Sequence, residues 1–131
     1  MTPPQKSSCE PVRYDNSNVF ACILRGEIPC KKIAEDDHTL AFEDISPARA
    51  VHVLVIPKGP YVDWLDFAAK ASADEQIAFM RMIAHVAEIT GIAETGFRVI
   101  SNIGQNGHQE VPHLHMHVLG GEAVGRMVSP S

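Results

Sequence analysis

The stretch His113–Leu119, HLHMHVL, alternates histidine with apolar residues and closes on two further apolar residues. A period of two is typical of a β-strand, in which alternate side chains share a face at a spacing of roughly 6.5–7 Å. We therefore expect a strand over these seven residues. Its three histidines point to one face, while Leu114, Met116 and Val118 point into the core.

Three roles are open to such a cluster. Structural or solvated histidines are the simplest, although three on one strand face rarely have that role. A zinc site is the second, since His-x-His on a strand is a common zinc geometry, but it needs further ligands such as Glu110 or His52. The third is nucleophilic attack at phosphorus, because a neutral imidazole is available near pH 7 and leaves a phosphoramidate readily. The pattern favours the third role and leaves the second open.

A second apolar run, Val51–Ile56 (VHVLVI), is closed by Pro57 and predicts a strand buried on both faces. His52 lies inside this run, where an imidazole without a hydrogen-bond partner is costly. We therefore expect His52 to bond a histidine of the 113–119 stretch and to orient it.

The rest of the chain predicts short elements with short connections. Strands are expected over 32–34, 38–43 and 97–101, a short helix from the cap Asn16-Ser17 to Gly26, and a helix from the capping box at 72–75 to about Thr90. Residues 58–71 are expected to form a connector with several apolar anchors, namely Tyr61, Trp64, Leu65 and Phe67. Consecutive strands without helices between them favour an antiparallel sheet. The expected fold class is α+β, with about five strands and two helices.

The long helix has a wide apolar surface. Its apolar face is expected from Ile77, Met80, Ile83, Ala84, Ala87 and Ile89, and is widened by Phe79, Met82 and Val86. Two explanations stay open, a dimer interface along the helix and a deep core within one chain.

Length and charge narrow the class of protein. With 131 residues, we expect one domain over 16–131 after a polar, proline-rich and flexible tail at 1–15. The net charge of −5 does not suggest a nucleic-acid or membrane-surface binder. The apolar stretches are too short for a signal peptide or a bilayer span, and the three cysteines form no disulfide or metal pattern. A cytoplasmic protein is expected.

With these segments placed, the chain resembles the histidine triad (HIT) superfamily from about Asn18 to Gly121. The signature of that superfamily is three histidines separated by single apolar residues, with two further apolar residues after the third histidine, as in 113–119. The resemblance is also carried by GEIP at 26–29, AFEDISP at 41–47, HVLVIPK at 52–58 and HVLGG at 117–121. These segments are most similar to the Hint branch, whose members are purine nucleoside phosphoramidases. The resemblance implies the HIT-type antiparallel sheet and a homodimer joined across the long helix and a sheet strand.

The resemblance also implies roles for individual residues. His115 would be the nucleophile that becomes nucleotidylated, and His117 would hydrogen-bond the α-phosphate. His113 and His52 would orient the other histidines, and Asp44 would take the ribose hydroxyls. An apolar slot for the base is implied at Ile45, Phe42, Ile28, Ile23 and Phe20, and contacts near the phosphate at Asn102, His108, Gln109, Glu110 and Val111. The expected ligand is a purine nucleotide of the AMP or GMP type, and no cofactor or metal is needed, because His117 and backbone amides can stabilise the phosphoryl charge.

The sequence departs from the Hint pattern at His108-Gln109-Glu110. Glu110 stands where a small hydroxyl residue is usual, so its carboxylate either repels phosphate or binds a cationic leaving group such as a lysyl amine. Pro112 is closer to the branch that hydrolyses diadenosine polyphosphates, whereas Leu119-Gly120-Gly121 favours Hint. The leading hypothesis is a nucleoside phosphoramidase. A diadenosine polyphosphate hydrolase and a nucleotide-binding regulatory protein with vestigial activity are the alternatives.

Overall fold

The computed structural model describes residues 14–127 of the chain. Its five strands are β1 (Lys32–Glu35), β2 (Thr39–Glu43), β3 (Val51–Pro57), β4 (Arg98–Ile100) and β5 (Met116–Gly120). They form one sheet in the order β1-β2-β3-β5-β4, and every neighbouring pair is antiparallel. The described helices are α1 (Val19–Leu24), α2 (Trp64–Lys70) and α3 (Ala73–Ile89). The expected α+β class and antiparallel sheet are confirmed.

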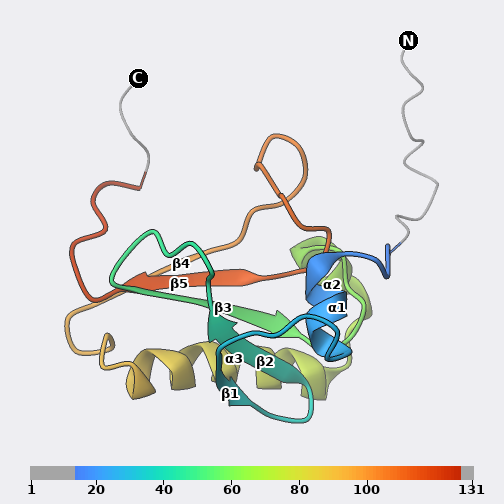
Figure 1. Cartoon of the computed structure of the whole chain (residues 1–131), viewed down its shortest axis with the longest axis horizontal. Helices are drawn as coiled ribbons and strands as arrows, with labels where there is room; N and C mark the ends of the chain where they lie inside the picture. Colours follow the sequence, from blue (N-terminus) through green and yellow to red (C-terminus); the bar gives the residue numbers. More distant parts are fainter. Residues whose placement is uncertain (1–13, 128–131) are drawn as a thin grey trace.

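The sheet separates two apolar clusters (Figure 1). On one face, α3 packs against β-strand side chains that include Val53, Val55 and Val118. On the opposite face, α1 packs against Leu54 and Ile56. β3 supplies side chains to both clusters and is buried along nearly all of its length, as its sequence predicts. Of the helices described between residues 14 and 127, none combines the length and apolar character needed to cross a membrane.

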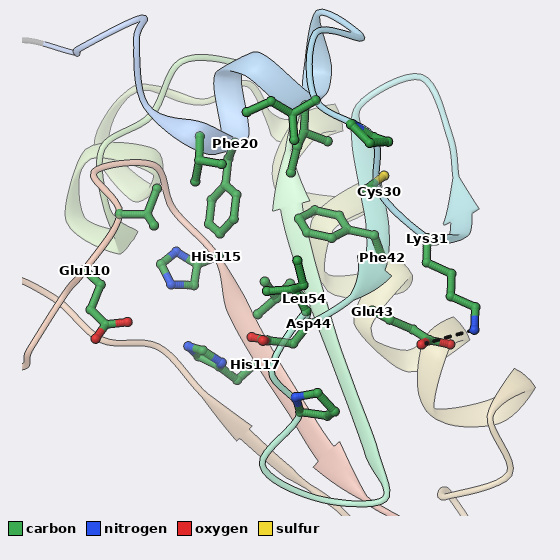
Figure 2. Close-up of a pocket in the computed structure, with 17 residues that line it drawn as sticks. Phe20, Cys30, Lys31, Phe42, Glu43, Asp44, Leu54, Glu110, His115 and His117 are labelled. Atoms are coloured by element: carbon green, nitrogen blue, oxygen red, sulfur yellow. Dashed lines mark ion pairs between the residues drawn. The ribbon is translucent and has the colours of Figure 1, made fainter.

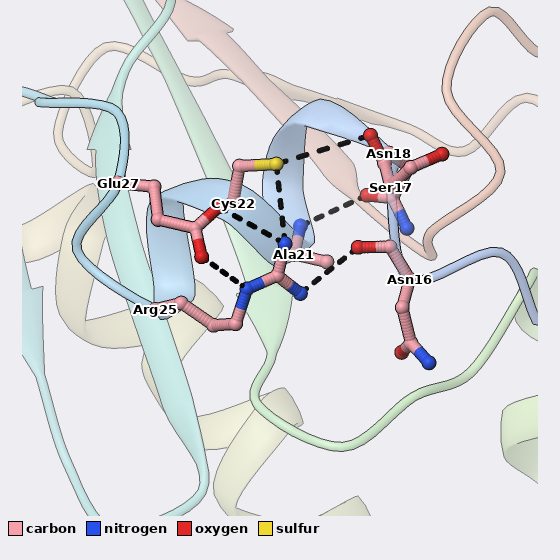
Figure 3. Close-up of polar contacts among 7 residues, drawn as sticks. All are labelled: Asn16, Ser17, Asn18, Ala21, Cys22, Arg25 and Glu27. Carbon is pink, nitrogen blue, oxygen red and sulfur yellow. Dashed lines mark hydrogen bonds and ion pairs between the residues drawn. The ribbon is translucent and has the colours of Figure 1, made fainter.

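Polar contacts hold the short helix α1 in place (Figure 3). The side-chain oxygen of Asn18 accepts a hydrogen bond of 2.9 Å from the backbone N–H of Ala21, the third helical residue. Beyond the last turn, Arg25 donates to the carbonyl of Asn16 at 2.9 Å. The N-cap is therefore Asn18 and not the predicted pair Asn16-Ser17, because the Asn18 side chain is the one that reaches a free helical N–H. This geometry directs Phe20 into the sheet face that carries the histidines.

The connector expected at 58–71 contains the helix α2, so the expected count of two helices is wrong for the described residues. Asp63 caps this helix by accepting a 2.9 Å hydrogen bond from the N–H of Asp66. Lys70 in the last turn pairs with Asp66 at 3.0 Å. Phe67 is the buried residue of the helix, so its seven residues present no repeated apolar face. Apolar periodicity therefore did not indicate this helix, although its N-cap residue and its terminal charges are typical of one.

The long helix α3 begins at the predicted capping box, in which Ser72 and Glu75 each bond the other's backbone. It ends before Gly91, whose φ of +81° suits glycine. The buried residues are Phe79, Met82, Ile83, Val86 and Ala87. Ile83 and Ala87 of the expected apolar face are therefore buried, together with the three residues expected to widen it. By contrast Ile77, Met80 and Ile89 are 50%, 70% and 50% exposed, so only part of the expected face meets the sheet. Both sets follow three-and-four spacing, and the sequence alone does not decide which of them meets the sheet.

The expected flexible tail at 1–15 falls almost wholly on residues 1–13, which lie outside the described residues.

Candidate functional site

The 113–119 stretch joins the sheet later than its sequence predicts. β5 begins at Met116, so His113 and His115 precede the strand. The backbone before it is engaged elsewhere, since the N–H of Leu114 donates to the carbonyl of Tyr61 at 2.8 Å. The alternation of side chains nevertheless holds. Leu114 lies in the cluster on the α3 face, and the ring of Phe20 on the α1 face meets the rings of both His113 and His115.

His52 and His117 form the first hydrogen-bonded pair of the site. The backbone N–H of Ala48 donates to Nδ1 of His52 at 2.9 Å, so the proton of a neutral His52 ring is on Nε2. That Nε2–H donates to Nδ1 of His117 at 2.9 Å. The proton of neutral His117 is then on its own Nε2, which makes this atom a donor. The predicted hydrogen bond from His52 to a histidine of the triad is confirmed.

His115 and His113 are fixed by a second set of contacts. Nδ1–H of His115 donates to the carbonyl of His113 at 2.8 Å, which leaves Nε2 of His115 with a free lone pair. Nε2–H of His113 donates to the carbonyl of Pro57 at 2.8 Å, and its Nδ1 accepts from the hydroxyl of Tyr14. Within the triad, therefore, His115 offers an acceptor and His117 a donor, while both nitrogens of His113 are already bonded.

Burial keeps these rings neutral. It lowers the pKa of His113 to about 4, against a small opposing effect of the hydrogen bond to Pro57. Burial also lowers the pKa of His117 to about 4, assisted by its histidine neighbours. For His115 and His52 the pKa is lowered by burial as well, although the carboxylate of Asp44 acts in the opposite direction on both. The hydrogen-bond directions above require neutral rings, and near pH 7 the site meets that condition.

A cavity of about 770 Å³ opens beside the histidines on the α1 face (Figure 2). Its lining combines apolar side chains with a few polar ones at the histidine end. The lining residues are Val19, Phe20, Ile23, Ile28, Pro29, Cys30, Lys31, Phe42, Glu43, Asp44, Ile45, Pro47, Leu54, Glu110, Val111, His115 and His117. A volume of this size is typical of a small-molecule site.

Most of the predicted site residues meet at this cavity. The predicted residues in its lining are Phe20, Ile23, Ile28, Phe42, Asp44, Ile45, Glu110, Val111, His115 and His117. His52 and His113 lie behind it and hold the other two histidines. Asn102, His108 and Gln109 do not belong to the lining.

Gln109 instead forms hydrogen bonds between its side chain and the backbone, both within the loop after β4 and to Val62. Its Oε1 accepts from the N–H of Gly104 at 3.0 Å. Its Nε2 donates to the carbonyls of Val62 and Val111 at 2.7 and 3.0 Å, which uses both of its N–H groups. The Gln109 side chain therefore has no free N–H group left to donate to a nucleotide, whereas the family resemblance implied that it would donate one. His108 is 86% exposed in its side chain and pairs with Glu110 at 3.2 Å.

The site also contains residues that were not predicted for it from the sequence: Tyr14, Leu54 and the pair Lys31 and Glu43. The position of Leu54 could have been predicted, because it lies two residues from His52 on the same strand and therefore shares its face. Lys31 precedes one predicted strand, Glu43 ends the next, and the two form a 3.6 Å ion pair on the cavity wall. No sequence pattern indicated a role for Tyr14, because it lies in the stretch 1–15, which has no apolar periodicity and was expected to be a tail.

Asp44, His52 and His117 are a group of ligand-type side chains, with donor atoms within 4.8 Å of one another. Coordination conflicts with the hydrogen bonds already described. Because Ala48 donates to Nδ1 of His52, the Nε2 of His52 carries a proton and has no lone pair for a metal ion. The group therefore suits a hydrogen-bonded relay better than a metal centre.

Comparison with known proteins agrees with this geometry. A model of the HIT domain matches residues 25–124. A HIT-like protein of Azospirillum brasilense is 53% identical over 116 residues, which cover 88% of this chain and 95% of that protein. The purine nucleoside phosphoramidase of Escherichia coli strain K12 is 42% identical over 114 residues, covering 85% of this chain and 92% of the enzyme.

Solved structures show the same likeness. A HIT family hydrolase from Clostridium thermocellum has a TM-score of 0.79 at 38% identity, with 86% of this chain and 97% of that chain covered. A histidine triad protein from Clostridium difficile has a TM-score of 0.74 at 39% identity, with 84% and 95% covered. The chain therefore belongs to the HIT family.

Proposed function

We propose that this chain hydrolyses purine nucleoside phosphoramidates, with His115 as the nucleophile. The hydrogen bond from Nδ1 of His115 to the carbonyl of His113 carries this assignment, because it leaves the Nε2 lone pair free on the cavity wall. His117 beside it has the opposite polarity, with a proton on Nε2, and its ring centroid lies 5.1 Å from that of His115. An acceptor next to a donor is the pairing needed to attack phosphorus and to bind a phosphoryl oxygen.

The proposed reaction has two steps. Nε2 of His115 attacks the α-phosphorus, the bond from phosphorus to the amine nitrogen breaks, and the amine leaves with the electron pair and takes up one proton. In the second step, the oxygen of a water molecule bonds to phosphorus while the bond to Nε2 breaks, which releases the nucleoside monophosphate and returns one proton. Nε2–H of His117 hydrogen-bonds a phosphoryl oxygen throughout and stabilises its growing charge.

The apolar part of the cavity is the proposed slot for the purine base. Phe20 and Phe42 form one wall, with ring centroids 5.7 Å apart. Ile45 lines the slot and is 98% exposed, so a base stacked against it would bury a large apolar side chain. Asp44 lies between this slot and the histidines in Figure 2, where the ribose of a bound nucleotide is proposed to lie.

The relatives support this choice of chemistry. One structural neighbour is named a HIT family hydrolase and one curated relative a purine nucleoside phosphoramidase. Together with the family membership, these names support a nucleotide hydrolase. The preference for a phosphoramidate over a diadenosine polyphosphate is our proposal.

The exposed apolar surface supports a homodimer. Ile77 and Met80 project from α3, and Val99 of β4 is 41% exposed. Among residues 14–127, β4 pairs with a strand on one side alone, which leaves its other edge free. A dimer should appear as twice the chain mass in light scattering, and Met80→Glu should shift it toward the monomer. A wild-type chain that is monomeric at micromolar concentration would contradict the dimer.

Intact-mass measurement after rapid mixing with adenosine 5′-phosphoramidate tests the nucleophile. The wild-type chain should gain one adenylyl group transiently, and His115→Ala should not. His85→Ala is the matched control, because His85 is exposed on α3 and lies outside the cavity lining. An adduct that persists in His115→Ala would assign the attack to another side chain.

A further inference from the structure

Charged side chains are distributed unevenly around the cavity. Among the described residues that line the cavity, Lys31 is the one cationic side chain, and it pairs with Glu43 on the wall that Figure 2 shows far from the histidines. The other two charged lining residues, Asp44 and Glu110, lie at the histidine end. Because His115 and His117 are neutral near pH 7, this end of the cavity is negative.

The two carboxylates differ in how firmly they are held. Oδ1 of Asp44 accepts a 2.8 Å hydrogen bond from the N–H of Ser46, and Oδ2 lies 3.4 Å from Nε2 of His52. The Asp44 side chain is only 18% exposed. Glu110 is 77% exposed, and His108, whose Nε2 lies 3.2 Å from its carboxylate, is also at the surface. Asp44 is thus part of the wall, whereas Glu110 is free to meet a group that enters the cavity.

The position of Glu110 fits the leaving-group side of a substrate. In Figure 2, His115 lies between Glu110 on one side and Phe42 and Leu54 of the apolar slot on the other. The charge of Glu110 reaches both His115 and His117, whose pKa it raises against the larger lowering by burial. A nucleotide with its base in the slot and its α-phosphate at the histidines therefore directs its leaving group out past Glu110.

We propose that Glu110 selects leaving groups by charge, so that the site favours phosphoramidates whose amine part carries a further positive charge and disfavours anionic leaving groups such as a phosphate chain. This inference rests on the proposed hydrolysis for its substrate orientation. A cation on the leaving group is attracted by Glu110, and a polyphosphate is repelled by both Glu110 and Asp44. Charge at this rim, and not the triad itself, then separates phosphoramidates from dinucleoside polyphosphates as substrates.

Matched substrates test the inference. Two adenosine 5′-phosphoramidates differ only at the end of the amine, one with a trimethylammonium group and the other with the neutral tert-butyl group of the same shape. The ratio of their kcat/KM values is measured for the wild-type chain and for Glu110→Gln, so that differences in intrinsic reactivity cancel. An exposed ion pair contributes a factor of about 2 to 5. Glu110→Gln should therefore lower the cation-to-neutral ratio by about 2- to 5-fold at low salt, and less at high salt, where screening weakens the interaction.

Glu94→Gln is the matched control, since it removes one negative charge from the exposed turn between α3 and β4. Its substrate ratio should equal that of the wild type. A ratio unchanged in Glu110→Gln, or lowered equally in Glu94→Gln, overturns the role of Glu110.

Binding separates this inference from the proposed hydrolysis. Dissociation constants of the same two compounds are measured by calorimetry in the His115→Ala background, with and without Glu110→Gln. If the wild type hydrolyses neither compound but Glu110→Gln still weakens binding of the cation selectively, Glu110 selects charge and the proposed reaction is wrong. If the neutral compound is hydrolysed and neither ratio responds to Glu110→Gln, the reaction stands and the selection by charge is wrong.

Discussion

Acidification should destabilise this fold through its buried histidines, whose pKa values are lowered by burial. His113 is fully buried, and burial lowers its pKa from 6.5 to about 4. The unfolded chain binds a proton at this residue below about pH 6.5, whereas the folded chain does not until about pH 4, so the free energy of unfolding falls as the pH drops through this window. At about 1.4 kcal/mol per pH unit, His113 alone contributes a loss of about 2 kcal/mol between about pH 7.5 and about pH 5. His117 acts in the same direction, with a smaller share because it is partly exposed.

Urea unfolding followed by circular dichroism at a series of pH values measures this loss. His113→Gln does not titrate and should unfold with a shallower pH dependence, whatever its stability at neutral pH. His85→Gln, on the exposed side of α3, should keep the wild-type dependence. An NMR titration of the His113 ring gives the folded pKa directly. Equal pH dependence in His113→Gln and the wild type, or a ring that titrates near its ordinary value, would refute the reasoning.

Three further substitutions probe the supports of the site. Tyr14→Phe removes the hydroxyl that donates to the buried Nδ1 of His113 and should lower the free energy of unfolding by about 1–3 kcal/mol; urea unfolding as stable as the wild type would show that this hydrogen bond contributes nothing. Ile45→Ser should weaken AMP binding by about 5- to 10-fold in calorimetry, because a base no longer buries the isoleucine side chain; an unchanged affinity would move the slot elsewhere. Gln109→Leu leaves three backbone groups without their partner, and we expect kcat to fall while the AMP dissociation constant changes little; the reverse pattern would mean that Gln109 contacts the nucleotide.

Much of this fold could be predicted from the strands, because a buried strand appears in the sequence as a short run of apolar residues. The run Val51–Ile56 is buried on both faces, and its sequence already showed no polar alternation apart from His52. Helix faces were harder. Three-and-four spacing on α3 fits both the buried set around Met82 and the exposed set around Met80, so only the position of the sheet decides between them.

The site was predictable to the extent that it lies on strands. His117 fell on the predicted face because strand alternation is local information, whereas Phe42 was assigned to the site only by the family resemblance. The loop at 102–111 was not predictable in this way. The side chain of Gln109 is directed by Val62, a residue 47 positions away in sequence, and no local pattern records that contact. The start of β5 was missed for the same reason, since the partner of Leu114 is the distant carbonyl of Tyr61.

The hydroxyl of Tyr14 and the ring of Phe20 come from a part of the chain that precedes the region matched by the HIT domain model, which begins at residue 25. A recombinant chain trimmed to residues 25–124 would keep every histidine of the site and lose the Phe20 wall of the proposed base slot, together with the hydroxyl partner of His113. If the proposed base slot is correct, we expect relatives with the same triad but a different amino-terminal segment to diverge in base preference and in acid stability. Sequence comparisons confined to the shared domain would miss that divergence.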